Sequence, residues 1–427
     1  MNQELKKLLS LAQAKGASDS EVYQVQSQSH PVFFEGNRLK QLENSQSTGT
    51  ALRLWYRECP GVAVAYGEID PEILVERAIA ISQLNTPETI DLTPARTEIV
   101  PNCDRSLVVR ELIAIGQDAI ERIRDLAPEA ICSGEFDSET ETTTLINSQG
   151  LHCQYAETNL SYYLGVELVR GEDFLGIYDG EDSKNTINCD RAIADIEQRL
   201  VWAETNITNP SGKFPVLLTP NAATILWDTV ASALNGKRVV EKSSPWSNNQ
   251  GKVVAADFLT ISQQHNCELY SCPFDDEGTP TKTLNLISGG QLNNFYCDRL
   301  IARELGVTPT GNGFRPSLES YPSPSLVNFI IEPGNVSFKQ LIAQLNNGII
   351  VDQVLGGGAD ISGEFSLNVD LGYRVRNGQV VGRIKDTAIA GNVYTIIKEI
   401  ATLGNDLLWN GSCKTPSVIV EGLSIVS

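Results

Sequence analysis

One histidine and two cysteines lie close together in the sequence and could bind a metal ion. His265, Cys267 and Cys272 form the pattern H-x-C-x4-C, and imidazole and thiolate are ligands that zinc takes in proteins. A fourth ligand would have to come from elsewhere, and Cys413 is the candidate. The spacing matches no standard zinc finger or ribbon. We therefore favour loop thiols and an exposed histidine, with zinc binding as the alternative.

The densest group of carboxylates is followed directly by a glycine, and two other segments are rich in glycine. The acidic group could hold a hard cation, but it lacks the alternating ligand spacing of a calcium loop. The glycine segments lack the lysine of a phosphate-binding P-loop, so they are expected to let backbone pass close to a neighbouring chain or a bound peptide. The candidates for lining a substrate groove are Asp275, Asp276, Glu277, Gly278, Gly311, Asn312, Gly356, Gly357 and Gly358.

A strand followed by a helix, near the middle of the chain, is another place where a hydrolase could mount a metal. The segment KFPVLLTPNAATILWDTVASALNG (213–236) predicts a strand at 214–218 and a helix at 221–235. Thr or Asn would cap the start of the helix and Gly236 would end it. The inner face of the helix is predicted to carry Trp227, Thr229, Val230 and Ala233. Because these include no histidine or cysteine, metal chemistry here would need ligands from elsewhere.

The N-terminal half alternates helices with antiparallel strands, which is typical of an α+β fold rather than of βαβ units. An amphipathic helix at 1–16 precedes strands that are predicted to form an antiparallel meander ending at Tyr66. Helices are further predicted at 71–84, 105–126 and 190–204, later strands at 130–138, 141–147, 151–168 and 173–178, and a connector at 85–101.

The segment NITNPSGK (206–213) is the predicted boundary between two domains, 1–205 and 213–427. Beyond it, strands dominate, and we expect a largely antiparallel, barrel-like sheet with long loops that carries the helix at 221–235. Short helices are also predicted at 298–305, 337–345 and 390–402.

The composition is acidic, with 33 Lys and Arg against 53 Asp and Glu and a net charge of −20. Such a charge repels phosphate backbones, so direct binding of nucleic acid is not expected. The nine cysteines show no C-x-x-C spacing, which favours reduced thiols and a cytoplasmic location. No apolar run approaches the length of a membrane span, so no membrane association is expected.

Several segments occur in the order in which one known family carries them. They include PFDDEGTPTKTLNLISGGQLNNFYCDRLIARELG, TPTGNGFRPS, PSPSLVNFIIEPG, NGIIVDQVLGGGADISGEFSL and GYRVRNGQVVGRIKDTAIAGN, with LGNDLLWNG and PSVIVEGLSI near the end. With FFEGNRLKQLENSQSTGTALRL near the N-terminus, they resemble the TldD/PmbA family, whose PmbA branch is also called TldE. The likeness covers nearly the whole chain.

The resemblance implies a relation to metalloproteolysis of small or unfolded peptides. TldD-type members carry His-Glu-x-x-x-His on the helix after the PVLL-type strand, and a cysteine near the C-terminus completes their zinc site. TldE-type members lack the motif and pair with TldD. In this sequence the two histidine positions fall on Trp227 and Ser232, and the glutamate position on Asp228. Zinc hydrolysis of peptides needs three protein ligands and a carboxylate, so we predict that this helix holds no ion.

The leading hypothesis is therefore a proteolytically silent, TldE-like subunit that needs no cofactor of its own. It would pair with a TldD-like subunit that holds zinc, and help to enclose an extended peptide through main-chain hydrogen bonds. One alternative is a metallopeptidase whose zinc is held by His265, Cys267, Cys272 and Cys413. The other is a stand-alone homodimer that binds peptides.

Overall fold

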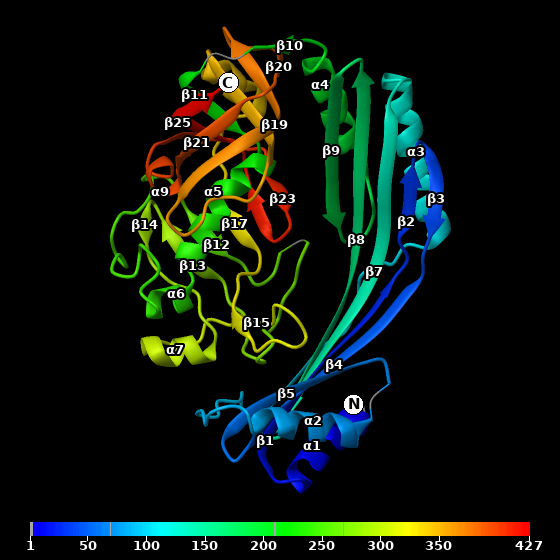
Figure 1. The fold of residues 1–427 in the computed structure, drawn as a ribbon, viewed down its shortest axis with the longest axis vertical. Helices are drawn as coiled ribbons and strands as arrows, with labels where there is room; N and C mark the ends of the chain where they lie inside the picture. The colour runs from blue at the N-terminus through cyan, green and yellow to red at the C-terminus, as the bar shows by residue number, and fades with distance from the viewer. Residues whose placement is uncertain (1–2, 69, 209–210, 268) are drawn as a thin grey trace.

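The computed structural model describes residues 3–68, 70–208, 211–267 and 269–427, and its N-terminal half (3–208) is built on one long curved sheet (Figure 1). In the described residues the sheet has nine strands, in the order β3-β2-β7-β1-β4-β5, with β8 pairing β7, β6 and β9. The bounds are β1 Ala17–Ser29, β2 Val32–Glu35, β3 Arg38–Leu42, β4 Ser45–Tyr56, β5 Cys59–Tyr66, β6 Arg96–Val100, β7 Ile131–Asn147, β8 Leu151–Arg170 and β9 Asp173–Ser183.

The position of β7 shows that the simple meander predicted for the first strands is wrong. β7 lies between β1 and β2, pairing with Glu21–Gln28 of one and with Val32–Phe34 of the other. β7 is long enough to pair with both strands because the two strands predicted at 130–138 and 141–147 form one continuous strand. The predicted connector at 85–101 also contains a strand, β6, which runs parallel to the start of β8.

Four helices cover this sheet at its two ends (Figure 1). α1 (Gln3–Ala14) and α2 (Pro71–Ser82) pack at one end, and α3 (Val109–Leu126) and α4 (Asp190–Trp202) at the other. α2 begins after Asp70, whose carboxylate accepts hydrogen bonds from the backbone N–H groups of Glu72 and Ile73, as expected of an N-cap. Each helix buries an apolar stripe against the sheet.

The C-terminal half (211–427) contains a barrel that β19 closes by pairing with both β18 and β21. Among the described residues its five strands are β11 Gly212–Leu218, β18 Gly348–Leu355, β19 Glu364–Arg376, β21 Ala388–Asn392 and β25 Val418–Val426. The pairs are antiparallel except for β11 with β18. The expected α+β fold with a barrel-like, largely antiparallel C-terminal sheet is thus confirmed. The same sheet also includes β10 Asn206–Ile207, β20 Gln379–Ile384 and β22 Ile400–Leu403.

A second sheet packs beside the barrel in the order β14-β13-β12-β17-β24-β23. Its strands are β12 Ile261–Gln263, β13 Leu284–Ser288, β14 Gln291–Leu292, β17 Phe329–Ile331, β23 Leu408–Asn410 and β24 Cys413–Thr415, and a short pair is formed by β15 Gly313–Phe314 and β16 Ser323–Pro324. β23 is the edge strand of the second sheet.

Helix α5 (Pro220–Ala233) follows β11 and packs between the barrel and the second sheet. Its predicted end at Gly236 is wrong, because Asn235 caps a further helix, α6 (Gly236–Val240). The remaining helices are α7 Arg299–Leu305, α8 Phe338–Leu345 and α9 Val393–Ile396. The helix predicted at 390–402 is therefore wrong over most of its length. None of the described helices has the length and apolar character that crossing a bilayer requires.

The two halves make contact toward both ends of the long sheet, and Tyr270 also donates a hydrogen bond to Asp182 of β9. Near α4, one continuous core combines residues of α3 and α4 with barrel residues such as Leu371 and Tyr373. Farther along, Phe274 packs against Tyr155 of β8, with ring centroids 5.3 Å apart. The predicted linker at 206–213 contains β10 and the start of β11, both in the barrel sheet. We keep the division into domains 1–205 and 213–427 as a proposal.

Candidate functional site

A cavity of about 530 Å³ lies where the long sheet faces α5 and β23, and we call it the central cleft. It is bordered by β8 and β9 on one side, and by the first turns of α5, by β18 and by β23 on the other. Its lining residues are Tyr163, Tyr178, Asp179, Gly180, Glu181, Asp182, Arg191, Asn221, Ala222, Thr224, Asp352, Gln353, Val354, Leu408, Trp409, Asn410 and Gly411.

The wall formed by the long sheet combines two stacked aromatic rings with a glycine, Gly180, that carries no side chain. Tyr163 and Tyr178 stack with their ring centroids 5.9 Å apart. Beside them, a Cβ on Gly180 would lie 2.5 Å from the carbonyl oxygen of Tyr162, so only glycine fits where the backbone passes this close. The wall therefore offers flat apolar surface to whatever lies in the cleft.

The outer edge of β9 is covered by side chains from other elements. The carbonyl of Tyr178 accepts hydrogen bonds from Gln353 at 3.3 Å and from Arg199 at 3.4 Å. Arg191 donates to the carbonyl of Gly180. Because these acceptors are already engaged, β9 does not offer this stretch of its edge for pairing with a further strand.

The facing edge, in contrast, is open. Among the described residues, the backbone of Leu408–Asn410 makes hydrogen bonds only to β24. Trp409 of this strand packs edge-on against Tyr270, with centroids 5.6 Å apart, and Lys414 lies over its ring. β23 therefore presents unpaired main-chain groups beside a fixed aromatic ring at the border of the central cleft.

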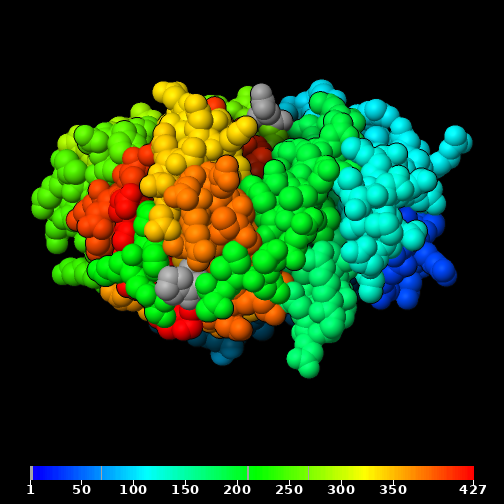
Figure 2. Space-filling model, turned by 90° about the horizontal axis from the view of Figure 1, so that it is seen from above, coloured from blue at the N-terminus to red at the C-terminus, as the bar shows by residue number. Residues whose placement is uncertain are grey.

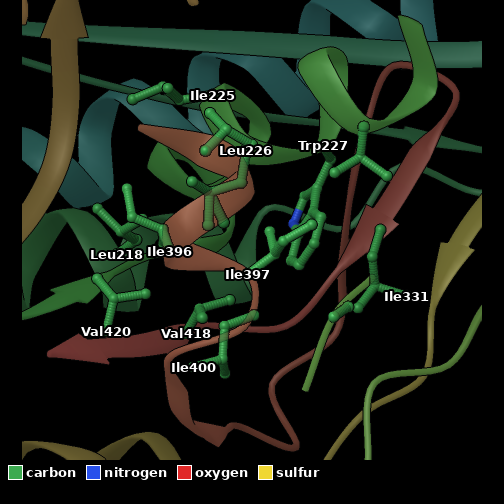
Figure 3. Packing of buried hydrophobic residues seen from close by; sticks show 14 of the residues in the cluster. Leu218, Ile225, Leu226, Trp227, Ile331, Ile396, Ile397, Ile400, Val418 and Val420 are labelled. Carbon is green, nitrogen blue, oxygen red and sulfur yellow. The ribbon is translucent and has the colours of Figure 1, made fainter. Parts of the chain in front are cut away.

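Trp227 lies inside the core, at the position where the resemblance places the first zinc ligand (Figure 3). Its side chain is fully buried among residues such as Ile331 and Val418. The indole nitrogen donates a hydrogen bond of 2.6 Å to Oγ1 of Thr415. Packing and the hydrogen bond together hold the ring in one place.

The other two motif positions lie on the outer sides of α5. Asp228 is exposed and Ser232 is half-buried. The carboxyl of Asp228 is close enough to Cys413 to influence its titration: burial and, second, this carboxylate raise the pKa of the Cys413 thiol to about 12. Although Asp228 keeps an exposed surface, the protein atoms around its carboxyl group remove part of its hydration, and this raises the pKa of Asp228. The carboxylate of Asp228 therefore acts on Cys413 electrostatically, while Trp227 points into the core.

These residues do not fit a zinc ion. An indole donates a hydrogen bond but offers no lone pair to a metal, and the position of Trp227 has no room for a ligand because the ring fills it. In the part of the chain that the structure describes, no three His, Cys, Asp or Glu side chains are grouped so that they could hold a metal. A catalytic zinc ion needs three protein ligands, and Asp228 and Cys413 could supply at most two.

The alternative ligands are divided between one turn, which carries three of them, and strand β24. His265, Cys267 and Cys272 lie on one hairpin turn, where the N–H of Cys272 donates to the carbonyl of His265. Nδ1 of His265 lies 3.2 Å from the hydroxyl of Thr283, and the thiol of Cys272 donates to the carbonyl of Phe274. Burial and the carboxylates of Asp276 and Asp275 raise the pKa of Cys272. Cys413 lies in β24, so the structure does not assemble these four side chains into one site.

The acidic loop lies at the second contact between the halves, where its carboxylates bond to backbone. Asp275 accepts hydrogen bonds from the N–H groups of Thr279 and Gly313, both at 2.8 Å. Asp276 accepts from Arg315 at 2.7 Å, and Glu277 from Arg299 at 2.9 Å.

Burial is the main cause of altered titration in this loop. It raises the pKa of Asp276 to about 6 and that of Glu277 to about 7. Gly278 has φ of +74°, and a Cβ there would lie 2.5 Å from the side chain of Leu151. Glycine is thus required where the loop meets the long sheet.

The glycine segments lie in two different surroundings. Asn312 is fully buried, donating to Gln263 at 2.6 Å and accepting from Thr310 at 2.7 Å. Gly311 has φ of +76°, and a Cβ there would lie 2.4 Å from the carbonyl oxygen of Pro280. The exposed Gly356, Gly357 and Gly358 instead lie in the loop after β18.

This loop approaches the motif helix. A Cβ on Gly358 would be 3.9 Å from Ile225, and Thr229 donates to the carbonyl of Ala359 at 3.2 Å. Among the proposed groove residues, the triple glycine therefore lies against α5. The acidic loop with Asp275, Asp276, Glu277 and Gly278 lies at the contact between the halves, whereas Gly311 and Asn312 pack inside the C-terminal half. Sequence reasoning did not find the residues of β9 and β23, which share no motif and meet only in the folded chain.

Comparison with known proteins agrees with this architecture. The fold matches the crystal structure of TldE from Thermococcus kodakarensis with a TM-score of 0.91 and 21% sequence identity, covering 99% of each chain. Residues 211–427 match the model of the PmbA/TldA metallopeptidase C-terminal domain, and residues 20–82 match PmbA/TldA metallopeptidase domain 1. The fold is therefore that of a metallopeptidase-related protein. The chain belongs to the PmbA/TldD family.

Two curated relatives resemble part of the chain. The metalloprotease TldD homolog of Buchnera aphidicola subsp. Acyrthosiphon pisum is 33% identical over 201 residues, 46% of this chain and 42% of that protein. The metalloprotease PmbA of Escherichia coli O157:H7 is 29% identical over 216 residues, 50% of this chain and 46% of that protein. Each match thus spans less than half the length of the relative.

Proposed function

We propose that the chain is a TldE-like, peptide-binding subunit that does not hydrolyse peptide bonds by itself. The observation that carries this proposal is the burial of Trp227 in the core, with its indole nitrogen bonded to Thr415. A side chain in that position cannot turn outward to bind an ion without opening the core. Asp228 and Cys413 alone do not provide the ligand set of a catalytic zinc.

The catalytic zinc would then belong to a second protein. The partner we propose is a TldD-like subunit, because relatives named TldD homologs and PmbA occur in the same family. In such a complex this chain contributes binding surface and the partner supplies the Lewis acid and activated water. A homodimer that only binds peptides is the second candidate for assembly.

The substrate in this proposal is an extended peptide held in the central cleft. β23 has an open edge there, and an added strand would satisfy its main-chain groups whatever the side chains of the peptide. Stacked Tyr163 and Tyr178 on one side, and Trp409 on the other, supply apolar contact area. The opposite edge, along β9, is covered by arginine and glutamine side chains, which favours β23 as the place of binding.

The experiment compares the purified chain alone with the chain mixed with a TldD-like protein from the same host. Zinc content is measured by mass spectrometry, and cleavage of an unfolded peptide is followed with and without a chelator. We expect the chain alone to bind peptide without cleaving it, and cleavage in the mixture to be abolished by the chelator.

Cleavage by the metal-loaded chain alone, lost on adding chelator, would overturn the proposal. If such a preparation also held stoichiometric zinc that a Cys267→Ala variant lost, the alternative ligand set of His265, Cys267, Cys272 and Cys413 would replace it. Stable homodimers that bind peptide and never associate with the TldD-like protein would favour the stand-alone assembly.

A further inference from the structure

A second cavity, of about 670 Å³, opens between α4 and α8, and we call it the aromatic pocket. Figure 2 shows the hollow between the green segment that contains α4 and the yellow segment that contains α8, with red C-terminal residues recessed within it. The pocket is lined by Arg191, Ala194, Asp195, Gln198, Arg199, Trp202, Thr219, Pro220, Phe338, Lys339, Ile342, Ile350, Asp352, Tyr373, Asp406, Leu407 and Leu408.

Three aromatic rings from separate elements form one side of this pocket. Trp202 of α4 meets Tyr373 of β19 edge to face, with centroids 5.2 Å apart, and lies 6.3 Å from Phe338 of α8. Ile342 and Ile350 add aliphatic surface. The charged lining residues belong mostly to ion pairs: Arg191 bonds to Asp195 at 2.8 Å, and Arg199 to Asp352 at 2.9 Å. The interior therefore suits an apolar group better than a charged one.

The aromatic pocket adjoins the central cleft. Arg191, Asp352 and Leu408 line both cavities. Between them, Arg199 bonds to Asp179 on the cleft side and to Asp352. Leu408 belongs to β23, the strand on which the proposed peptide would lie. A side chain projecting from such a peptide would therefore have the pocket within reach.

Tyr373 adds a buried hydroxyl group to the lining of the pocket. Its side chain is fully buried, and among the described residues its hydroxyl has no hydrogen-bond partner. A buried hydroxyl group without a hydrogen-bond partner lowers the stability of the fold. Burial raises the pKa of this phenol well above its ordinary value, so the group remains a donor at any physiological pH.

We propose that the aromatic pocket receives a bulky apolar or aromatic side chain of the peptide held in the central cleft. This inference rests on the proposed peptide-binding function and adds a preference to it. Side chains such as phenylalanine or leucine would bury their apolar surface against Trp202, Phe338 and Ile342, with main-chain groups remaining on β23. Small or charged side chains at the same peptide position would leave the pocket unused.

The test measures binding of labelled, unfolded peptides that differ at one central residue, which is Ala, Leu, Phe or Glu. The direct readout is fluorescence anisotropy. We expect the Phe and Leu peptides to bind about tenfold or more tightly than the Ala peptide, as is usual for a filled apolar pocket. The Glu peptide should bind with no higher affinity than the Ala peptide.

Two variants assign the preference to this pocket. Ala194→Trp places a large ring at the mouth, because Ala194 is exposed and lines this pocket without lining the central cleft. It should abolish the preference for Phe and leave the affinity for the Ala peptide unchanged. Ala14→Trp is the matched control, since Ala14 is an exposed alanine of α1. Trp202→Ala should reduce the preference in the same way, with circular dichroism verifying its fold.

The outcomes separate this inference from the proposed function. Equal binding of all four peptides, or a preference that survives Ala194→Trp, would overturn the aromatic pocket as a subsite and leave peptide binding intact. Absence of binding for every peptide would overturn the proposed function and the subsite with it.

Discussion

Arg315 reaches from the C-terminal half to Glu21 of the long sheet, with Nη2 2.9 Å from Oε1 and both side chains at most 2% exposed. The same oxygen lies 3.1 Å from Nη2 of Arg53. One buried carboxylate is therefore shared by two arginines, one from each half. Arg315 also lies over the ring of Tyr23, so the pair is fixed on several sides at the contact that contains the acidic loop.

Removing this shared carboxylate should weaken the whole fold. Glu21→Ala leaves Arg53 and Arg315 buried without their partner, and breaking a buried pair in this way costs about 3–5 kcal/mol. Urea unfolding of the full chain measures the loss. Glu76→Ala is the control, because the Lys15–Glu76 pair is solvent-exposed and should change little. If both variants lost the same free energy of unfolding, burial of the Glu21 pair would not explain its contribution to stability.

The acidic loop should make stability depend on pH. Burial raises the pKa of Glu277 to about 7 and that of Asp276 to about 6, so the folded chain holds protons that the unfolded chain has released. The stabilisation is complete below the ordinary carboxyl pKa and is lost as pH rises through the raised values. We expect Tm to fall between pH 5 and pH 8 more steeply in the wild type than in Glu277→Gln.

The amide of that variant can still accept the hydrogen bond from Arg299. The control is Glu304→Gln, which alters an exposed carboxylate of α7 and should leave the slope as in the wild type. A Glu277→Gln profile parallel to that of the wild type would refute the assignment.

The hydrogen bond between Trp227 and Thr415 should contribute measurably to stability. Thr415→Val keeps the shape of the side chain but leaves the indole N–H buried without an acceptor, at a cost of about 1–3 kcal/mol. Trp227→Ala adds a large cavity and should cost about 3–5 kcal/mol. Guanidinium unfolding measures both, and Trp409→Ala, at the partly exposed border of the cleft, should cost less. A Trp227→Ala variant as stable as the wild type would contradict the packing described for α5.

Backbone pairing on β23 predicts a response to peptide N-methylation. In an added strand, alternate N–H groups of the peptide donate to the edge and the others point away. Methylating single peptide nitrogens in turn should therefore weaken binding at every second position and spare those between, as anisotropy would detect. Uniform weakening, or none, would speak against strand addition.

The sequence was informative where local pattern and tertiary packing agree. The strand and helix around Trp227 were foreseen because the apolar run, the Thr-Pro start and the helix length are all local. The segment at 390–402 has helical spacing of apolar residues, but β21 and β22 pair with β19 and β25 over long distances. Because these strands take up most of the segment, only a single helical turn, α9, remains. The strand pairing depends on residues far away in the sequence, so no local pattern reveals it.

The candidate site shows the same division. The resemblance predicts that Trp227 takes the position of a zinc ligand, and the burial of Trp227 follows from the apolar face of α5. The central cleft could not be read in this way, because Tyr178, Thr224 and Trp409 come together only after three separate elements have assembled. The acidic loop stood out in the sequence by its charge. The structure places it at the contact between the halves, where its carboxylates accept hydrogen bonds from backbone N–H groups that are distant in the sequence.

The covering of β9 by Arg191, Arg199 and Gln353 has a consequence for how copies of this protein behave at high concentration. A long, uncovered strand at the margin of a large sheet would be a template on which other molecules could polymerise. Here the margin at Tyr178 and Gly180 is occupied by side chains of the same molecule, while the open edge of β23 beside the cleft is three residues long. An edge of this length could pair with a short peptide but offers little template for the stacking of further chains.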